Sequence, residues 1–132
     1  MAVGGDIVEI SDNHPTLGSF VYKVQTSQDN TYDTGGNRTN DDNSQVTGSA
    51  EMIIQINGKL GFFQAVIVND MSQKVAERLS QLAGSPVNST WTFSVINNIT
   101  YRGSGRPVGD ISPNVNNSTL TLKVSGPQFK QV

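Results

Sequence analysis

One stretch of sequence decides the fold: residues 47–68 read TGSAEMIIQINGKLGFFQAVIV. Two sets of side chains alternate along its first half, with Ala50, Met52, Ile54 and Ile56 opposite Ser49, Glu51, Ile53 and Gln55. Alternation with a period of two is typical of a half-buried strand, and Asn57-Gly58 is a residue pair that favours a two-residue hairpin turn. The stretch therefore predicts a hairpin of strands 47–56 and 59–68, with one face on the core.

Two further hairpins are predicted downstream. The first joins residues 90–96 to 99–102 through Asn97-Asn98, and the second joins residues 108–115 to 118–125 through Asn116-Asn117. A strand at residues 19–26 precedes all three hairpins. Alternation places one set of apolar side chains from these strands in the predicted core: Phe20, Tyr22, Val24, Trp91, Phe93, Val95, Leu120, Leu122 and Val124. The pattern predicts a mainly β protein.

Short polar side chains dominate the composition, since Asn, Ser and Thr supply 38 of the 132 residues. These residue types favour strands and turns over helix. The absence of cysteine excludes thiolate metal sites, disulfides and thiol nucleophiles. Any serine–histidine pair would need His14, the single histidine, and no serine lies in a Gly-x-Ser-x-Gly motif. We therefore expect a loop histidine at position 14, and neither a catalytic residue nor a cofactor.

One α-helix is predicted over about residues 70–83. Asp70 can cap it, with Gln73 reciprocating, while Gly84 in a left-handed conformation and Pro86 can end it. An apolar stripe at helical spacing faces the sheet: Met71, Val75, Leu79 and Leu82. The polar side chains between them are expected to face outward: Lys74, Glu77, Arg78 and Gln81.

A long polar loop is expected between the first strand and the first hairpin. Residues 27–45, SQDNTYDTGGNRTNDDNSQ, contain one aromatic and no aliphatic side chain, so this segment cannot fold on its own apolar content. We interpret it as an arm that becomes ordered against another molecule; plain surface disorder is the alternative. Its acidic residues lack the spacing of a calcium loop, so no metal site is predicted.

The charge balance and hydropathy limit the possible partners. A net charge of −2 without a basic cluster argues against tight nucleic-acid binding, which depends on lysine and arginine displacing counterions. No apolar run approaches the roughly 20 residues that a membrane helix needs, and the N-terminal residues MAVGGDIVEI do not have the pattern of a signal peptide. No membrane insertion is expected.

The order of these elements, together with two closing motifs, resembles a known family. The motifs are YRGSGRPVGDI at residues 101–111 and TLTLKVSGP at residues 119–127. From about residue 19 to 132 the chain resembles the tail tube proteins of contractile-tailed bacteriophages. The resemblance implies one tail-tube domain over residues 1–132: a partly closed antiparallel β-barrel or sandwich with one flanking helix.

The resemblance also implies a function and a set of partners. Members of the family form hexameric rings that stack into a hollow tube, through which the phage genome is delivered to the host cell. The implied partners are other copies of the chain, a contractile sheath protein, baseplate and tail terminator proteins, and a tape measure protein in the lumen. DNA would pass through without specific binding. The implied location is the virion tail, assembled in the bacterial host cytoplasm.

Placement by analogy gives three groups of candidate site residues. Ring-to-ring contacts and ion pairs between subunits fall on the loop, at Asp29, Asp33, Arg38, Asp41 and Asp42. Lumen-facing positions are Glu51 and Gln55, and sheath-facing positions are the polar helix residues Lys74, Glu77, Arg78 and Gln81. Two alternatives stay open: a tube subunit of a type VI secretion system or a bacteriocin, and a secreted β-sandwich binding module.

Overall fold

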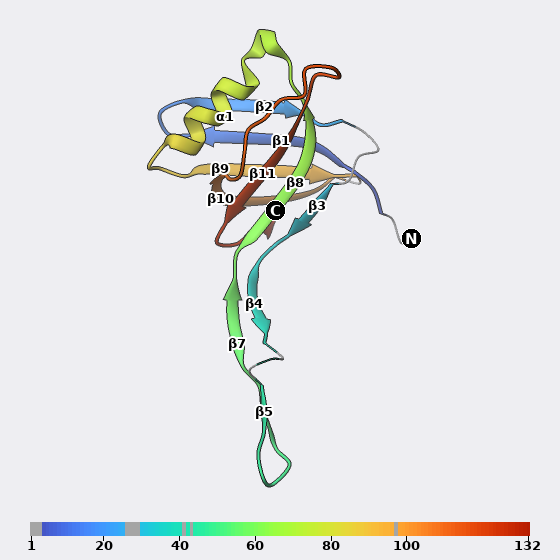
Figure 1. The fold of residues 1–132 in the computed structure, drawn as a ribbon, viewed down its shortest axis with the longest axis vertical. Helices are drawn as coiled ribbons and strands as arrows, with labels where there is room; N and C mark the ends of the chain where they lie inside the picture. The colour runs from blue at the N-terminus through green and yellow to red at the C-terminus, as the bar shows by residue number, and fades with distance from the viewer. Residues whose placement is uncertain (1–3, 26–29, 41, 43, 97) are drawn as a thin grey trace.

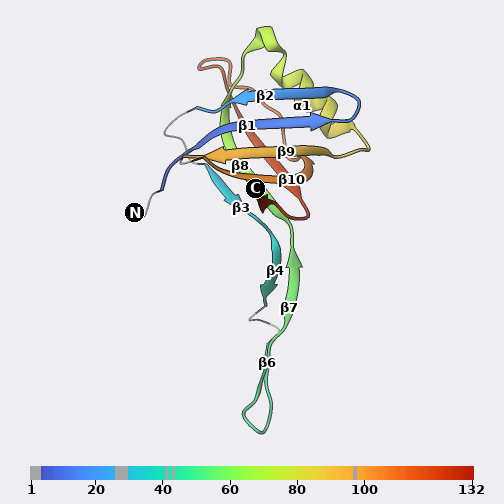
Figure 2. The same cartoon turned by 180° about the vertical axis from the view of Figure 1, so that it is seen from behind.

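The computed structural model describes residues 4–25, 30–40, 42, 44–96 and 98–132. It is mainly β with one α-helix, and it has two visibly different parts (Figure 1). The body is a curled sheet with the helix packed against it. The arm is a narrow two-stranded ribbon that projects away from the body. Figure 2 shows from behind that the arm stands clear of the body along its length.

Eight strands form the sheet of the body: β1 (Ile7–His14), β2 (Gly18–Lys23), β3 (Thr31–Asp33), β8 (Gly61–Val68), β9 (Ser89–Val95), β10 (Ile99–Pro107), β11 (Thr119–Gly126) and β12 (Lys130–Gln131). The spatial order is β2-β1-β9-β10-β11-β8-β3, with β12 beside β10 and every pairing antiparallel. The sheet curls until the segment after β2 meets β8. There a single bridge joins Val24 to Ile67, and the Gln25 N–H donates to the Val66 carbonyl at 2.9 Å. Because one bridge replaces a full ladder, the sheet is not a closed barrel.

The core fills the inside of this curl with aromatic rings. Trp91 and Phe93 of β9 pack on Phe63 of β8, with ring centroids 6.0 and 4.7 Å apart, and Phe129 covers Phe63 at 5.6 Å. The predicted core positions Tyr22, Trp91, Phe93, Leu120, Leu122 and Val124 are buried, while Phe20, Val24 and Val95 are partly buried against them. The period-two alternation therefore identified the core correctly in these strands.

The hairpin predicted at residues 90–102 is confirmed. Strands β9 and β10 pair from Ile99 with Val95 to Gly105 with Ser89. Asn98 takes a left-handed conformation (φ +62°) in the turn, which asparagine tolerates better than most residues. The other turn residue, Asn97, lies outside the described residues.

The hairpin predicted at residues 108–125 is present only in part. The main partner of β11 is β8, paired from Thr119 with Val68 to Gly126 with Gly61. Its contact with β10 is limited to the pairs Arg106–Ser125 and Pro107–Val124. Residues 108–118 form a loop, because Gly109 has φ +78° and Pro113 has no N–H for a ladder.

The first predicted hairpin is wrong in its turn and in its buried face. Asn57 and Gly58 lie inside strand β7 (Ile56–Lys59), which pairs with β4 (Gly36–Thr39), and the turn lies earlier, at residues 47–50. The segment after that turn belongs to the arm, so its apolar side chains are exposed instead of buried. Alternation indicates that a segment is a strand, but it does not show which element packs on that strand. Here the strands after the turn pair with β4, which lies in the polar segment 27–45, and with residues 45–46 at its end.

The predicted helix is divided in two. A 3-10 turn, η2 (Met71–Gln73), precedes α1 (Val75–Gly84), and Lys74 between them is left-handed (φ +54°). The Asp70 carboxylate accepts the Ser72 N–H at 3.1 Å, as expected of a cap. The helix stops because Ser85 is extended, not because Gly84 turns left-handed.

The apolar stripe of the helix is confirmed in three of its four positions. Val75, Leu79 and Leu82 are buried against the body. Met71 is 78% exposed, because the break at Lys74 takes it out of phase with the stripe. Within the part of the chain that is described, no helix combines the length and apolar character needed to cross a membrane.

Candidate functional site

The arm is built from two short ladders in series. β4 pairs with β7, and β5 (Gln45–Val46) pairs with β6 (Met52–Ile53) at the far end. Between the ladders the Asn40 N–H donates to the Gln55 carbonyl at 2.7 Å. The described residues of the polar segment 27–45 are therefore not a structureless loop: they contribute to β3, β4 and β5, which pair with strands that follow them in the chain.

Apolar side chains on the arm are exposed to solvent. A two-stranded ribbon has no layer packed on either face and is at best marginally stable alone in water. The exposed apolar side chains of the arm and its root are Val46, Met52, Ile53, Ile54, Ile56 and Leu60, each more than half exposed. Clustering of this kind marks an interaction surface, whereas scattered single apolar residues do not.

The charges of the arm are segregated along its length. We call residues 39–58 the distal arm; its charged residues are Asp41, Asp42 and Glu51, all acidic. The basic residues Arg38 and Lys59 lie in β4 and β7, and both form ion pairs with Asp33 at the root, where the arm joins the body. The distal arm is therefore apolar and acidic, without a compensating cation.

An ion-pair cluster holds the root. The Asp33 carboxylate accepts the Gly35 N–H at 2.9 Å and Arg38 Nη2 at 2.6 Å, and its other oxygen lies 3.4 Å from Lys59 Nζ. The Gly35 N–H, followed by the two cations, lowers the pKa of the Asp33 carboxyl below its usual 3.8. Arg38 was predicted to pair across subunits; here it pairs with Asp33 of its own chain. Asp29 and Asp41 lie outside the described residues.

Glycine allows the arm and the body to approach closely at this root. Gly35 and Gly36 both have left-handed φ values, +78° and +97°. A Cβ on Gly35 would lie 2.5 Å from the Gly61 backbone nitrogen, so a side chain there would push β8 away. The neighbouring Thr34 carbonyl accepts the Phe129 N–H at 2.8 Å. The direction in which the arm leaves the body is thus set by backbone contacts as well as by charge.

The other predicted site residues fall in two places. Glu51 and Gln55 are exposed on the arm and not on a sheet with a core behind it, so the premise for placing them on a lumen wall is wrong. Lys74, Glu77 and Gln81 are exposed on the helix, and so is Asp42 on the arm. Arg78 does not face outward: its side chain is 13% exposed.

Arg78 instead reaches a buried carboxylate that the sequence did not single out. Its Nη2 lies 3.0 Å from Asp12 Oδ2 in β1 and also donates to the Gly18 carbonyl at 2.7 Å, while its Nη1 donates to the Leu17 carbonyl at 3.2 Å. Burial raises the pKa of the Asp12 carboxyl, and Arg78 partly opposes that rise. The guanidinium thereby joins the helix to the β1–β2 end of the sheet.

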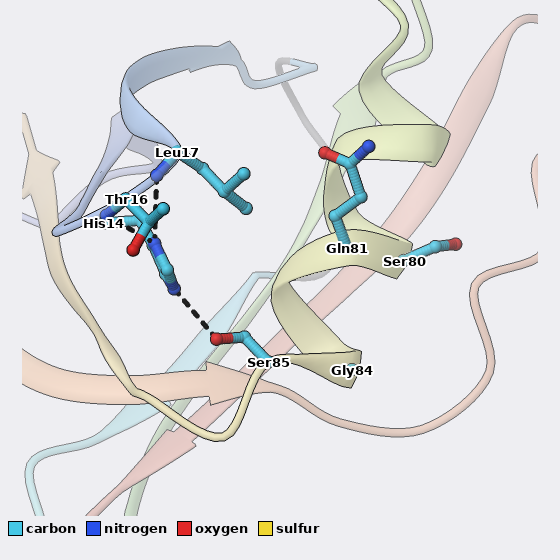
Figure 3. Close-up of a pocket in the computed structure, with 7 residues that line it drawn as sticks. All are labelled: His14, Thr16, Leu17, Ser80, Gln81, Gly84 and Ser85. Carbon is cyan, nitrogen blue, oxygen red and sulfur yellow. Dashed lines mark hydrogen bonds between the residues drawn. The ribbon is translucent and has the colours of Figure 1, made fainter.

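His14 ends β1 beside a surface hollow between the β1–β2 turn and the end of the helix (Figure 3). The sequence predicted a loop histidine, but His14 is buried and is the last residue of β1. Its Nδ1 accepts the N–H groups of Thr16 and Leu17 at 3.0 and 3.1 Å, and its Nε2 lies 3.0 Å from Ser85 Oγ. Ile10, Asp12 and His14 share one face of β1, so a period-two reading from Ile10 could have found both polar residues.

The His14–Ser85 pair is not arranged as a catalytic serine and base. Because two N–H groups donate to Nδ1, this nitrogen must be unprotonated. The ring proton is therefore on Nε2, and the Nε2–H group donates a hydrogen bond to Ser85 Oγ. A base would need the opposite tautomer, with Nδ1–H held by an acid or carbonyl and Nε2 free to accept. The pair is therefore a structural link between the β1–β2 turn and the end of α1.

Two further findings concern ligands and relatives. Among the described residues no three histidine, aspartate or glutamate side chains gather where they could hold a metal ion.

A scan against protein-family models and a search of curated proteins found no match to this chain. The arm is thus the feature of the described chain that most clearly points to a function.

Proposed function

We propose that this chain is the subunit of a phage tail tube, which assembles into hexameric rings that stack into a hollow conduit for the genome. The observation that carries the proposal is the arm, a projecting ribbon with apolar side chains exposed on both of its strands. Exposed apolar area of this kind is costly in water, at about 25 cal/mol per Å². Contact with another subunit would remove that cost.

The body supports the same proposal through its edge. Beyond the Val24–Ile67 bridge, β2 has a neighbour in β1 only, so most of its outer edge is unpaired among the described residues. Unpaired strand edges favour pairing with another chain, and closing a ring of subunits removes them. A ring would use this edge and leave the arm for contacts between rings.

The low charge of the chain suits a conduit for DNA. A wall rich in lysine and arginine would bind phosphates with a large salt-dependent free energy and hold the genome in place. This chain has a net charge of −2, with 9 basic and 11 acidic residues. As a tube subunit it would have a sheath, baseplate, tail terminator and tape measure protein as its partners, and DNA would slide through without being bound.

Negative-stain microscopy of the purified protein tests the proposal. We expect hollow tubes from the natural chain, and folded but dispersed particles when Met52, Ile53 and Ile54 are all changed to threonine. The matched control changes Val8 and Val115, exposed apolar residues of the body outside β2, to threonine; its tubes should persist. Circular dichroism verifies that each variant keeps its β structure.

The alternative outcomes are equally clear. Separate rings that never stack would favour a type VI secretion tube subunit. Monodisperse monomers at every concentration and salt would overturn the proposal. Tubes that persist in the arm variant would show that the arm does not carry the stacking contact.

A further inference from the structure

The distal arm needs a receiving surface of particular chemistry. It offers apolar side chains at Met52, Ile53 and Ile54 together with the acidic residues Asp42 and Glu51. A complementary surface is a groove with apolar walls and free cations nearby. The arm cannot use a surface of its own body, because the ribbon points away from it in both views (Figures 1 and 2).

Such a groove lies on the body, between the ends of β10 and β11 and the root of the arm. It is lined by Leu60, Asn88, Arg106, Val108, Ser125 and Pro127. Leu60 is 65% exposed, and Val108 and Pro127 add apolar surface beside it. The groove is thus apolar at its centre, as the core of a protein interface usually is.

One cation lines this groove, and a second lies near it on β11. Arg106 lines it and donates from Nε to Asn88 Oδ1 at 2.8 Å. Lys123 stands two residues before Ser125 on β11, so both lie on one face of the strand, and its Nζ sits 5.1 Å above the Phe62 ring. Neither cation forms an ion pair with a carboxylate of the described residues. Both charges are therefore open to an acidic partner.

We propose that this groove receives the distal arm of a second copy of the chain. Apolar contact between the Met52–Ile53 strand and Leu60, Val108 and Pro127 would provide most of the affinity. Exposed ion pairs add little free energy, about 0–1 kcal/mol each, so Arg106 and Lys123 would mainly orient the acidic arm. The docking is inferred from these surfaces alone, whereas its role as the ring-to-ring contact rests on the proposed function.

The pairing of two different surfaces has a geometric consequence. Arm and groove are distinct parts of the molecule, so the contact is head-to-tail and each copy can both give an arm and receive one. Such contacts propagate in one direction unless a rotation closes them. A stack of rings, in which each ring receives arms from the next, is one arrangement that satisfies this rule.

Disulfide trapping tests the docking, since the natural chain has no cysteine. Met52→Cys on one copy and Ser125→Cys on another are mixed and oxidised, with one partner mass-tagged so that the mixed dimer is distinguished. Val21→Cys, on the exposed outer face of β2, replaces Ser125→Cys in the control mixture. We expect several-fold more mixed dimer with Ser125→Cys than with Val21→Cys. Equal yields, or none, would overturn the proposal.

Charge reversal provides a second measurement. Arg106→Glu in the receiving copy should reduce the cross-link yield, and Glu51→Lys in the arm of the other copy should restore it. Failure of that rescue, with both variants folded, would count against the assigned groove. Cross-linked dimers without tubes would support the docking and overturn the proposed tube function. Tubes without the cross-link would support the tube function and overturn the docking.

Discussion

Arg78 and Asp12 form an ion pair across 66 residues of sequence, with Arg78 Nη2 3.0 Å from Asp12 Oδ2. The Asp12 side chain is fully buried and Arg78 is nearly so. Arg78 also packs its guanidinium over the Phe20 ring at 5.3 Å. One side chain therefore connects the helix, β1 and β2, and removal of either member of the pair would leave the charge of the other buried without a partner.

The first prediction is that Arg78→Met destabilises the protein strongly at neutral pH. Removing one member of a buried pair leaves an uncompensated charge and costs about 3–5 kcal/mol. Without Arg78, burial would raise the pKa of Asp12 further above 3.8. A raised carboxyl pKa gives stability that is present at low pH and lost as the pH rises through it. Urea unfolding should therefore show a larger deficit at pH 7 than near pH 4.

Two controls separate charge from packing at this pair. The double variant Asp12→Asn with Arg78→Met should recover much of the loss, because no buried charge remains. Lys74→Met, which removes an exposed cation at the junction between η2 and α1, should change the unfolding free energy by no more than about 0.5 kcal/mol. An Arg78→Met deficit that does not change with pH would contradict the assignment.

The second prediction concerns His14. His14→Ala removes the acceptor for the Thr16 and Leu17 N–H groups and the link to Ser85, and should cost about 2–3 kcal/mol at about 1 kcal/mol per bond. His14→Asn keeps a short acceptor for the turn and should cost less. Thermal unfolding of the two variants compares them directly. Equal losses would mean that the turn bonds contribute nothing.

The third prediction is that Asp33 fixes the direction of the arm. Spin labels on Ser49→Cys and Thr90→Cys would report the distance between tip and body. Asp33→Asn keeps the acceptor for the Gly35 N–H but loses both ion pairs, and Asp33→Ala loses all three contacts. The distance distribution should broaden in that order, while Asp42→Asn, the same change elsewhere on the arm, leaves it narrow.

The same cluster gives a pH dependence of known sign. Because the pKa of Asp33 is lowered from 3.8, its contribution is present above about pH 4 and is lost as the pH falls through the lowered value. The natural chain should therefore converge on the Asp33→Asn distribution in acid, while the variant changes little. A distribution of the natural chain that stays narrow throughout would contradict the role of the cluster.

The fourth prediction compares two glycines. A Cβ on Gly105 would lie 2.5 Å from the Ser125 carbonyl oxygen, where β10 and β11 cross, whereas a Cβ on Gly58 in the arm meets nothing within 4 Å. Gly105→Ala should cost about 1–3 kcal/mol through overpacking. Gly58→Ala should be neutral in a denaturant titration. Comparable effects of the two changes would contradict this account of the crossing.

Much of the body could be predicted from alternation, and the arm could not. Trp91, Phe93, Leu120, Leu122 and Val124 alternate with polar residues because a core lies on one side of their strands. Met52, Ile54 and Ile56 alternate in the same way without a core, since period two follows from the pleat and not from burial. What covers a strand depends on pairing partners far away in sequence.

The partners of the polar residues in β1 and at the arm root could not be predicted, for a related reason. Asp12 is buried because Arg78 reaches it from a helix 66 residues away, and neither position carries a local signal of that pairing. Asp33 and Lys59 meet because β3 pairs with β8 and β4 pairs with β7, which brings together residues far apart in sequence. Short motifs predict local turns and caps, such as the Asp70 carboxylate that accepts the Ser72 N–H. Pairing between residues far apart in sequence determines which strands are covered and which charges meet.

The thinness of the arm also determines what unfolding experiments on the isolated chain can report. Both the denaturant dependence of the unfolding free energy and the heat capacity change scale with the surface exposed on unfolding. Residues 51–60 are already exposed in the folded chain, so their unfolding adds little to either quantity. A melting curve would therefore report mainly on the body. Hydrogen exchange at the Asn40 and Thr47 amides, which donate to Gln55 and Glu51, would report on the arm separately.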